Sequence, residues 1–377
     1  MTLAVVGGLA LIAGTVGRDY VRGASFVIEA AGIEGWPKTI ASLSAGNAYR
    51  LDRVQIPTRD ASLAARVVAS DGAARRAVLL VPGVHAGGIE EPRLVGFAED
   101  LAARGFTVVT AELPDLKQYA ITPRSTDMIE DAARWLSEQR NLARNGRVGL
   151  IGISFGGGLS VVAAGRPSIR DRVAFVLSFG GHGDLPRTLR YLCTGVLADG
   201  SRHPPHDYGV VIILLGVADR MVPADQVTRL RDGIRTFLEA SHVDMVDKAR
   251  ARTIFDRARA MAAAMPEPSR SLMTAVNDRD VARLGPRLLP HVEALGADPT
   301  LSPLDAPAPR APVFLLHGAD DNVIPSLEST LLADHLRPHT AVRVLLTPLI
   351  THAEVNRPAD WGEIWKLVSF WTDVLDD

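Results

Sequence analysis

The chain has 377 residues, and its 41 Lys and Arg nearly balance its 43 Asp and Glu, giving a formal net charge of -2 at pH 7. This balance argues against a dedicated nucleic-acid-binding protein, which would carry a strongly basic face. A hydrophobic share of 47% and a charged share of 22% argue against a disordered chain. Because Cys193 is the single cysteine, an intramolecular disulfide framework and a cysteine zinc cluster are excluded.

Residues 3–17 form an uncharged segment, followed by Arg18 and Arg22. The segment is shorter than the ~20 residues that a membrane-spanning helix needs. Three interpretations stay open: a membrane tether, a cleaved export signal, or a helix packed on the folded domain. The expected localisation is therefore cytoplasmic or membrane-associated through residues 3–17, with export as the third alternative.

From about residue 50 the pattern alternates between short apolar runs and helical periodicity. This alternation predicts an α/β fold with a doubly wound, mostly parallel sheet. Helices are expected at 92–104, at 125–138 with Ser125 or Thr126 as its cap, and from the turn after residue 153 to about residue 164. Strands are expected at 50–57, 63–70, 77–81, 106–111, 148–153 and 173–179.

The pattern changes after residue 184, and residues 184–300 are predicted to be mostly helical, most clearly at 227–238, 246–264 and 269–281. Strands return at 313–316 and 342–346, with helices near 327–336 and 361–375. We therefore expect one catalytic domain, residues 46–184 and 311–377, interrupted by a large helical cap insertion at 185–310. Residues 1–45 form an N-terminal apolar segment and lead-in.

The sequence GISFG at 152–156 follows the expected strand 148–153 directly and opens a helix. A G-x-S-x-G pattern at a strand–turn–helix junction is typical of a nucleophile elbow, in which the turn exposes the serine hydroxyl. The alternative is a helix-capping serine in a glycine-rich chain. The context favours Ser154 as the nucleophile.

A serine nucleophile needs a base and an orienting acid, and on this type of sheet they follow the serine in the order acid, then histidine. Asp321 lies in the loop after the strand 313–316, with Asp320 as the near alternative. His352 lies in a loop after the last expected strand and ahead of the terminal helix. His317 is expected to end its strand and brace the acid loop, while His85, His182 and His242 are interpreted as surface, loop or cap residues.

The transition-state oxyanion also needs hydrogen-bond donors. One is expected to be the backbone N–H of Phe155, directly after the nucleophile. The second is expected in the glycine-rich loop after the strand 77–81, from the backbone N–H of Val84, with His85 as the alternative.

These residues resemble the α/β-hydrolase superfamily, and the GISFGGG sequence at 152–158 is similar to its esterase and dienelactone-hydrolase-like branches. The likeness covers roughly residues 50–185 and 310–377. It implies an eight-stranded, mostly parallel sheet and no cofactor, and the match at 317–325 places the acid on Asp321. Dienelactone hydrolases use a cysteine nucleophile, so the serine at Ser154 departs from that specific activity.

A second carboxylate, Asp219, lies in a sequence that runs in the same register as the acid loop, after the apolar run 210–215. Asp219 is therefore an alternative acid. The interpretation that we favour is a buried helix over 208–222, with Asp219 paired to a nearby arginine. No metal site is expected, because His203 and His206 have no evident further ligands.

The sequence thus predicts a serine hydrolase that cleaves carboxylic esters of moderately hydrophobic acyl groups through an acyl-enzyme. The expected partner is a small-molecule ester, with no nucleic acid, and the sequence leaves the oligomeric state open. Two alternatives remain: a thioesterase or acyltransferase with the same triad, and a non-catalytic binding protein of hydrolase fold.

Overall fold

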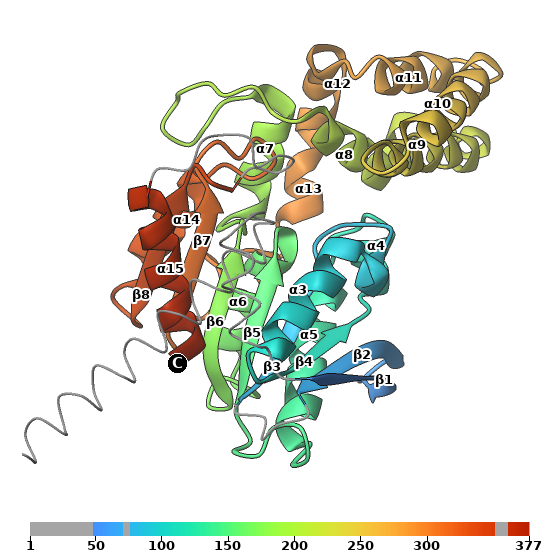
Figure 1. Ribbon diagram of the computed structural model, residues 1–377. Coiled ribbons are helices and arrows are strands. Elements are labelled where there is room, and N and C mark those ends of the chain that lie inside the picture. The colour runs from blue at the N-terminus through green and yellow to red at the C-terminus, as the bar shows by residue number, and fades with distance from the viewer. Residues whose placement is uncertain (1–47, 71–75, 351–360, 377) are drawn as a thin grey trace, which may run out of the picture.

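The structure, a computed structural model, describes residues 48–70, 76–350 and 361–376. Within these ranges eight strands form one sheet in the order β1-β2-β4-β3-β5-β6-β7-β8 (Figure 1). β2 runs antiparallel to β1 and β4, and the other neighbouring strands are parallel. The predicted doubly wound, mostly parallel fold class is confirmed. The strands are β1 (Tyr49–Pro57), β2 (Ser62–Ser70), β3 (Arg76–Val81), β4 (Phe106–Ala111), β5 (Val148–Ile153), β6 (Val173–Phe179), β7 (Val313–Gly318) and β8 (Val342–Thr347).

The central strands are apolar on both faces because each face packs against helices. In β3, Leu79 and Val81 belong to one core while Val78 and Leu80 belong to the other, as the two-residue period of a strand requires. All four side chains are at most 2% exposed. This double burial explains why the strand appears in the sequence as an unbroken apolar run.

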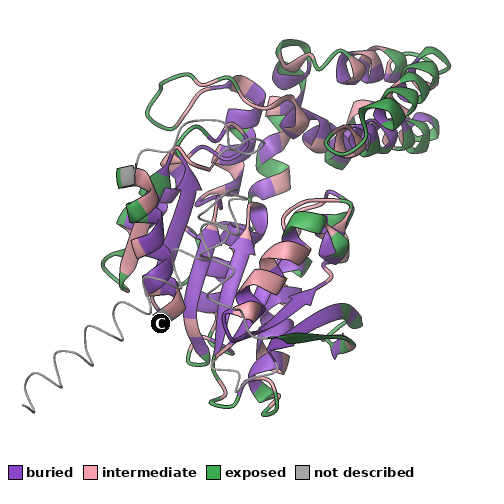
Figure 2. Ribbon diagram, viewed as in Figure 1, coloured by how far each residue is buried: buried purple, intermediate pink, exposed green. Residues whose placement is uncertain are grey.

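Two layers of helices cover the sheet. Leu101 of α3 (Pro92–Ala103) and Phe370 of α15 (Trp361–Asp376) pack into one core, and the rings of Phe97 and Trp371 lie 5.9 Å apart. The other core contains buried residues of α5 (Pro123–Glu138), α6 (Phe155–Gly165) and α14 (Leu327–Leu336). Figure 2 shows the central strands almost entirely buried between partly exposed helices, whereas the edge strand β1 is largely exposed.

The start of α5 differs from the sequence-based expectation. Ser125 and Thr126 were expected to cap the helix, but both lie inside it and are fully buried. The helix begins two residues earlier because Pro123 occupies its first turn, where a missing N–H costs nothing, and Thr122 takes the cap position. The Thr126 hydroxyl instead donates to the carbonyl oxygen of Thr300 at 2.8 Å.

Between β6 and β7 the chain forms a series of helices that Figure 1 shows gathered at one end of the sheet. We call the segment between residues 185 and 310 the helical insertion. Its α-helices are α7 (Leu185–Thr194), α8 (Asp207–Met221), α9 (Ala224–Asp244), α10 (Lys248–Ala263), α11 (Ser269–Asn277), α12 (Val281–Leu288) and α13 (Val292–Gly296). The remaining short elements of the fold are η1 (Gly88–Glu90), α4 (Pro114–Lys117), η2 (Leu289–His291) and η3 (Pro299–Leu301).

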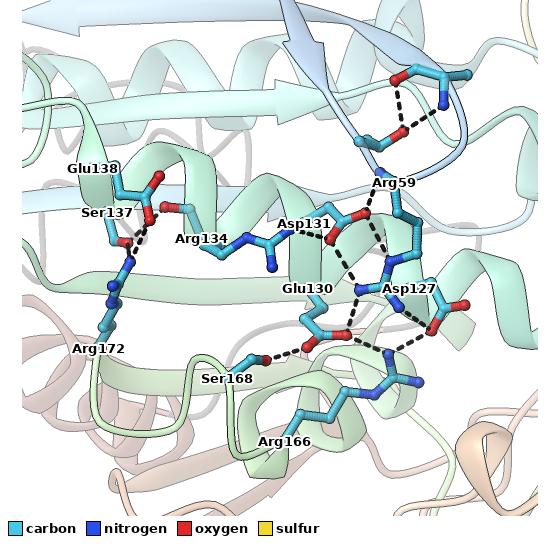
Figure 3. Close-up of polar contacts among 12 residues, drawn as sticks. Arg59, Asp127, Glu130, Asp131, Arg134, Ser137, Glu138, Arg166, Ser168 and Arg172 are labelled. Atoms are coloured by element: carbon cyan, nitrogen blue, oxygen red, sulfur yellow. Dashed lines mark hydrogen bonds and ion pairs between the residues drawn. The ribbon is translucent and has the colours of Figure 1, made fainter.

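A network of opposite charges joins the β1–β2 turn to α5 and to the residue after α6 (Figure 3). The Arg59 guanidinium contacts Asp131 at 2.9 Å and Glu130 at 2.7 Å. Arg166 contacts the same Glu130 at 2.6 Å and Asp127 at 2.5 Å. We call these five residues the α5 charge network, and its hydrogen bonds raise the pKa of Arg59 although burial opposes the shift.

The expected localisation requires a correction. No helix in the part of the chain that the structure describes is long and apolar enough to cross a membrane. Residues 3–17, on which the prediction of membrane association rested, lie outside the described residues. The expected membrane association through that segment is therefore not supported.

Candidate active site at the carboxyl edge of the sheet

Ser154 occupies the turn between β5 and α6 with a strained backbone. Its φ of 54° and ψ of -130° lie in a region that residues other than glycine rarely adopt. The turn is fixed because the Ser154 N–H donates to the Phe179 carbonyl at 2.7 Å and the Gly157 N–H donates to the Ser154 carbonyl at 2.8 Å. A strained strand-to-helix turn of this kind lifts a serine hydroxyl above the sheet edge.

The turn is closed by contacts that leave no room for side chains. A Cβ atom on Gly152 would collide with the Gly156 carbonyl, and one on Gly156 would collide with the carbonyl of Pro82. The elbow is thus packed directly against the loop that follows β3. The two glycines of the motif are required by this close approach of backbones.

The loop after β3 runs beside the nucleophile. A Cβ atom placed on Gly83 would lie 3.2 Å from Cβ of Ser154, so the next residue, Val84, lies close to the serine. Phe155 is the first residue of α6, where backbone N–H groups lack partners within the helix. The structure therefore brings both predicted oxyanion donors, Val84 and Phe155, to the neighbourhood of Ser154.

Asp321 is held rigidly in the loop after β7 and is 5% exposed. Its Oδ1 accepts from the backbone N–H groups of Val323 at 2.8 Å and Ile324 at 3.0 Å, and such donors favour the ionised carboxylate. A Cβ atom on Gly180, directly after β6, would lie 3.6 Å from Oδ2. Since β5, β6 and β7 are parallel neighbours, Ser154, Gly180 and the acid loop share one edge of the sheet.

His317 supports the acid loop from below and is fully buried. Its Nε2 lies 2.8 Å from the Ile324 carbonyl, which can only accept, so Nε2 carries the proton. Its Nδ1 then accepts from the Ser329 hydroxyl at 2.7 Å. With both ring nitrogens engaged and Asp321 Oδ2 at 3.4 Å from Nε2, His317 has a bracing role in this geometry.

His352, the predicted base, lies outside the described residues. The chain nevertheless enters that segment at a defined place, because a Cβ atom on Gly318 would collide with the carbonyl oxygen of Ile350. Gly318 pairs with Thr347 of β8, and the acid loop follows Gly318 directly. The described chain therefore stops two residues before His352 and next to the loop of Asp321.

The alternative acid Asp219 lies elsewhere. It occupies the last turn of α8, where its side chain is 56% exposed and pairs with Arg231 at 2.9 Å. Asp320 is exposed beside Asp321. Of the three carboxylates, Asp321 alone accepts from the backbone N–H groups that close the turn after β7.

Three histidines interpreted as surface, loop or cap residues have specific positions near the site. His182 is fully buried and its ring lies 5.4 Å from that of Phe155, while burial lowers its pKa. His85, next to Val84, hydrogen-bonds to His242 of α9 at 2.8 Å. The motif around residue 85 could have drawn attention to His85, but no local signal indicates a partner in another helix.

The chain matches one family model and is similar to several solved structures. A family model described as alpha/beta hydrolase fold matches residues 76–348. A hyperthermophilic esterase from the archaeon Pyrobaculum calidifontis is similar with 17% identity and a TM-score of 0.47, over 96% of this chain and 92% of the esterase. A dienelactone hydrolase from Anabaena variabilis is similar with 17% identity and a TM-score of 0.43, over 86% and 96% of the two chains. A search of curated proteins finds no match.

Proposed function

The chain belongs to the α/β-hydrolase family, and from that premise we propose that it is a serine hydrolase that cleaves carboxylic esters of moderately hydrophobic acids. The observation that carries the proposal is the strained backbone of Ser154, with a φ of 54° at the β5–α6 turn. Strain of this kind persists where the surrounding structure enforces it, and it clusters at functional sites. The Gly83 loop on one side and Asp321 on the other add donors and a carboxylate to the same edge.

In the proposed reaction, Ser154 Oγ attacks the ester carbonyl carbon while His352 accepts the hydroxyl proton. The N–H groups of Val84 and Phe155 stabilise the oxyanion, and His352 then gives its proton to the departing alcohol oxygen. Water attacks the acyl-enzyme, passes a proton to His352 and releases the acid, and His352 returns the proton to Ser154. Asp321 orients the imidazole and stabilises its cation.

Proximity of the helical insertion supports the choice of substrate class. The insertion reaches the site where the His206 N–H donates to the Asn322 carbonyl at 2.8 Å, one residue from the proposed acid. Its neighbouring helices carry buried apolar residues, with Val210, Val211 and Leu214 of α8 at most 1% exposed. We propose that the acyl chain binds between this insertion and the sheet, because sites for small molecules are usually lined mostly by apolar side chains.

A fluorophosphonate probe tests the proposal on the intact protein. We expect stoichiometric labelling that peptide mapping places on Ser154, loss of the label in Ser154→Ala, and turnover of p-nitrophenyl esters by the wild type. A folded wild-type protein that neither labels nor turns over any ester of a graded acyl series would contradict the proposal. That result would favour a non-catalytic binding protein.

A further inference from the structure

Four polar side chains with no part in the proposed mechanism meet between the loop after β3 and the helical insertion. His85 lies in that loop and Tyr119 follows α4, while Tyr208 belongs to α8 and His242 to α9. We call these four residues the His–Tyr cluster. Each pair within it joins the catalytic sheet to the insertion.

The first pair has a defined direction of hydrogen bonding. The Gly87 N–H donates to His85 Nδ1 at 3.1 Å, so the proton of the neutral His85 ring is on Nε2. Nε2 then donates to Nδ1 of His242 at 2.8 Å, and the rings meet edge to face with centroids 4.3 Å apart. Burial and the neighbouring His242 lower the pKa of His85 to about 4, which keeps the ring neutral.

The second pair consists of Tyr119 and Tyr208, and Tyr119 has a strained backbone. Burial raises the pKa of Tyr119, while the nearby Tyr208 hydroxyl and Ala86 backbone oppose the shift, and the rings of Tyr119 and Tyr208 lie 6.1 Å apart. Tyr119 has a φ of 64° and is 7% exposed. A tyrosine in the left-handed region costs free energy and requires fixed neighbours.

The backbone N–H of Gly87 is therefore fixed by the His85 side chain, which His242 of the insertion fixes in turn, and the neighbouring Ala86 lies beside Tyr119, whose ring packs against Tyr208 of the insertion. Val84 lies just before these loop residues, and Gly83 is held against Ser154. The loop segment that contains the Val84 N–H is thus fixed before Val84 by the contact of Gly83 with Ser154, and after Val84 by the His–Tyr cluster.

We propose that the helical insertion positions the oxyanion loop, and that His242 and Tyr208 are the positioning residues that do so through His85 and Tyr119. The inference rests on the proposed function and assigns to the insertion a role in catalysis beyond shaping a substrate pocket. A displacement of about 1 Å at a reacting centre can cost on the order of 100-fold in rate, so the loss of either contact should act on the transition state.

The main test compares three variants in ester turnover. His242→Leu removes the acceptor for His85 Nε2 and should lower kcat by about 10- to 100-fold, with KM changed by less than about 3-fold. His242→Asn places an amide oxygen close to the position of Nδ1 and should restore kcat to within about 3-fold of the wild type. His339→Leu, at an exposed histidine after α14, is the matched control and should leave kcat unchanged.

A transition-state analogue separates positioning from a general loss of structure. The inhibition constant of a trifluoromethyl ketone should rise across these variants in proportion to the fall in kcat/KM, because the ketone adduct carries the oxyanion. Tyr208→Phe removes one oxygen atom and should lower kcat by about 5- to 10-fold in the same correlation. If His242→Leu does not fold, Tyr208→Phe tests the positioning role by itself.

The failure of this inference is distinct from the failure of the proposed function. Folded His242→Leu and Tyr208→Phe proteins with kcat within about 2-fold of an active wild type would overturn the inference and leave the hydrolase standing. An equal loss in His242→Asn and His242→Leu would also overturn it, because rescue depends on the acceptor. A wild type without turnover or Ser154 labelling would overturn both.

Discussion

The α5 charge network and the His–Tyr cluster both join distant parts of the chain, but they do so with different chemistry. In the charge network, Arg59 and Arg166 each contact more than one carboxylate, and the Asp131 side chain is 1% exposed. The His–Tyr cluster is instead joined by a hydrogen bond between two histidine rings and by a contact between two tyrosine rings. Tyr119 of this cluster has a strained backbone. On our proposals, the charge network contributes to stability and the His–Tyr cluster to the position of the oxyanion loop.

The two regions should therefore respond differently to mutation. Changes to the proposed catalytic side chains at the sheet edge should abolish turnover with little effect on unfolding, and changes in the charge network should do the reverse. Measurements of kcat and of the free energy of unfolding test this difference.

The largest effect is expected for Ser154→Ala. Removal of the nucleophile should lower kcat by about 10⁶-fold, the scale seen when a nucleophile acts as part of a triad. Thermal unfolding should be nearly unchanged, because the turn is held by backbone hydrogen bonds of Ser154 and Gly157 that the substitution retains. Ser201→Ala, at an exposed turn, is the control, and a loss below about 10-fold in Ser154→Ala would assign the nucleophile elsewhere.

The second largest effect is expected for Asp321→Asn. This change should lower kcat by about 10⁴-fold, because an amide cannot hold the imidazole in the required tautomer. Asp219→Asn should leave kcat within about 2-fold, since Asp219 is exposed and paired with Arg231. Steady-state kinetics of the two variants at one pH are sufficient. The reverse ranking would assign the acid to Asp219.

In the charge network, Asp131→Asn should lower the free energy of unfolding by about 2 kcal/mol. This is less than the cost of breaking a fully buried pair, because the Arg59 side chain is 38% exposed and retains contact with solvent. Asp171→Asn breaks the exposed pair with Arg310 and should cost less than about 0.5 kcal/mol. Urea titration measures both free energies of unfolding. A fall in kcat for Asp131→Asn would contradict the expectation that the charge network affects stability and not turnover.

A pair of glycine substitutions tests the close packing of the elbow. Gly156→Ala should destabilise the protein by about 1–3 kcal/mol and reduce turnover, because the new Cβ atom collides with the Pro82 carbonyl. Gly96→Ala, in the middle of α3 with nothing within 4 Å of the new atom, should stabilise it by about 0.5–1 kcal/mol. Equal effects on unfolding would contradict the packing argument.

The smallest effect concerns the pH dependence of stability. Burial tends to raise the pKa of Glu130, but hydrogen bonds from Ser168, Arg59 and Arg166 hold it below its ordinary value of 4.5. The stabilisation is fully present above pH 4.5 and is lost as the pH falls toward the folded-state pKa, because the unfolded chain binds the proton first. Glu130→Gln should therefore show a shallower loss of stability below pH 4.5, whereas an unchanged slope would contradict this origin.

Much of the sheet could be predicted from the sequence because its central strands are buried on both faces. The runs at β5 and β6 give their strand limits directly, since apolar residues end where the turns begin. The start of α5 was misjudged because Ser125 and Thr126 resemble caps locally, and only the tertiary structure buries them. Local capping signals are weak when a proline two residues earlier can also open a helix.

The candidate site likewise contains some residues that could be predicted from the sequence and others that could not. Ser154 could be proposed as the nucleophile because its motif and its turn are contiguous, and Asp321 could be proposed as the acid because its loop follows a clear apolar strand. The pairing of His85 with His242 could not be predicted, because the two residues are 157 positions apart and their contact depends on where α9 lies relative to the loop after β3. Sequence reasoning thus finds residues that act through local geometry and misses those that act across elements.

The pairing of β6 with β7 has a consequence for how the protein folds. Val176 pairs with Val313, although the whole helical insertion lies between them. Closing so long a loop costs chain entropy before the strand contacts can repay it, and non-local pairing of this kind is slow. Since β1 to β6 pair without crossing the insertion, we expect these six of the eight strands to form first. The nucleophile and the acid would then belong to different stages of folding, and a nascent chain would remain inactive until β7 docks.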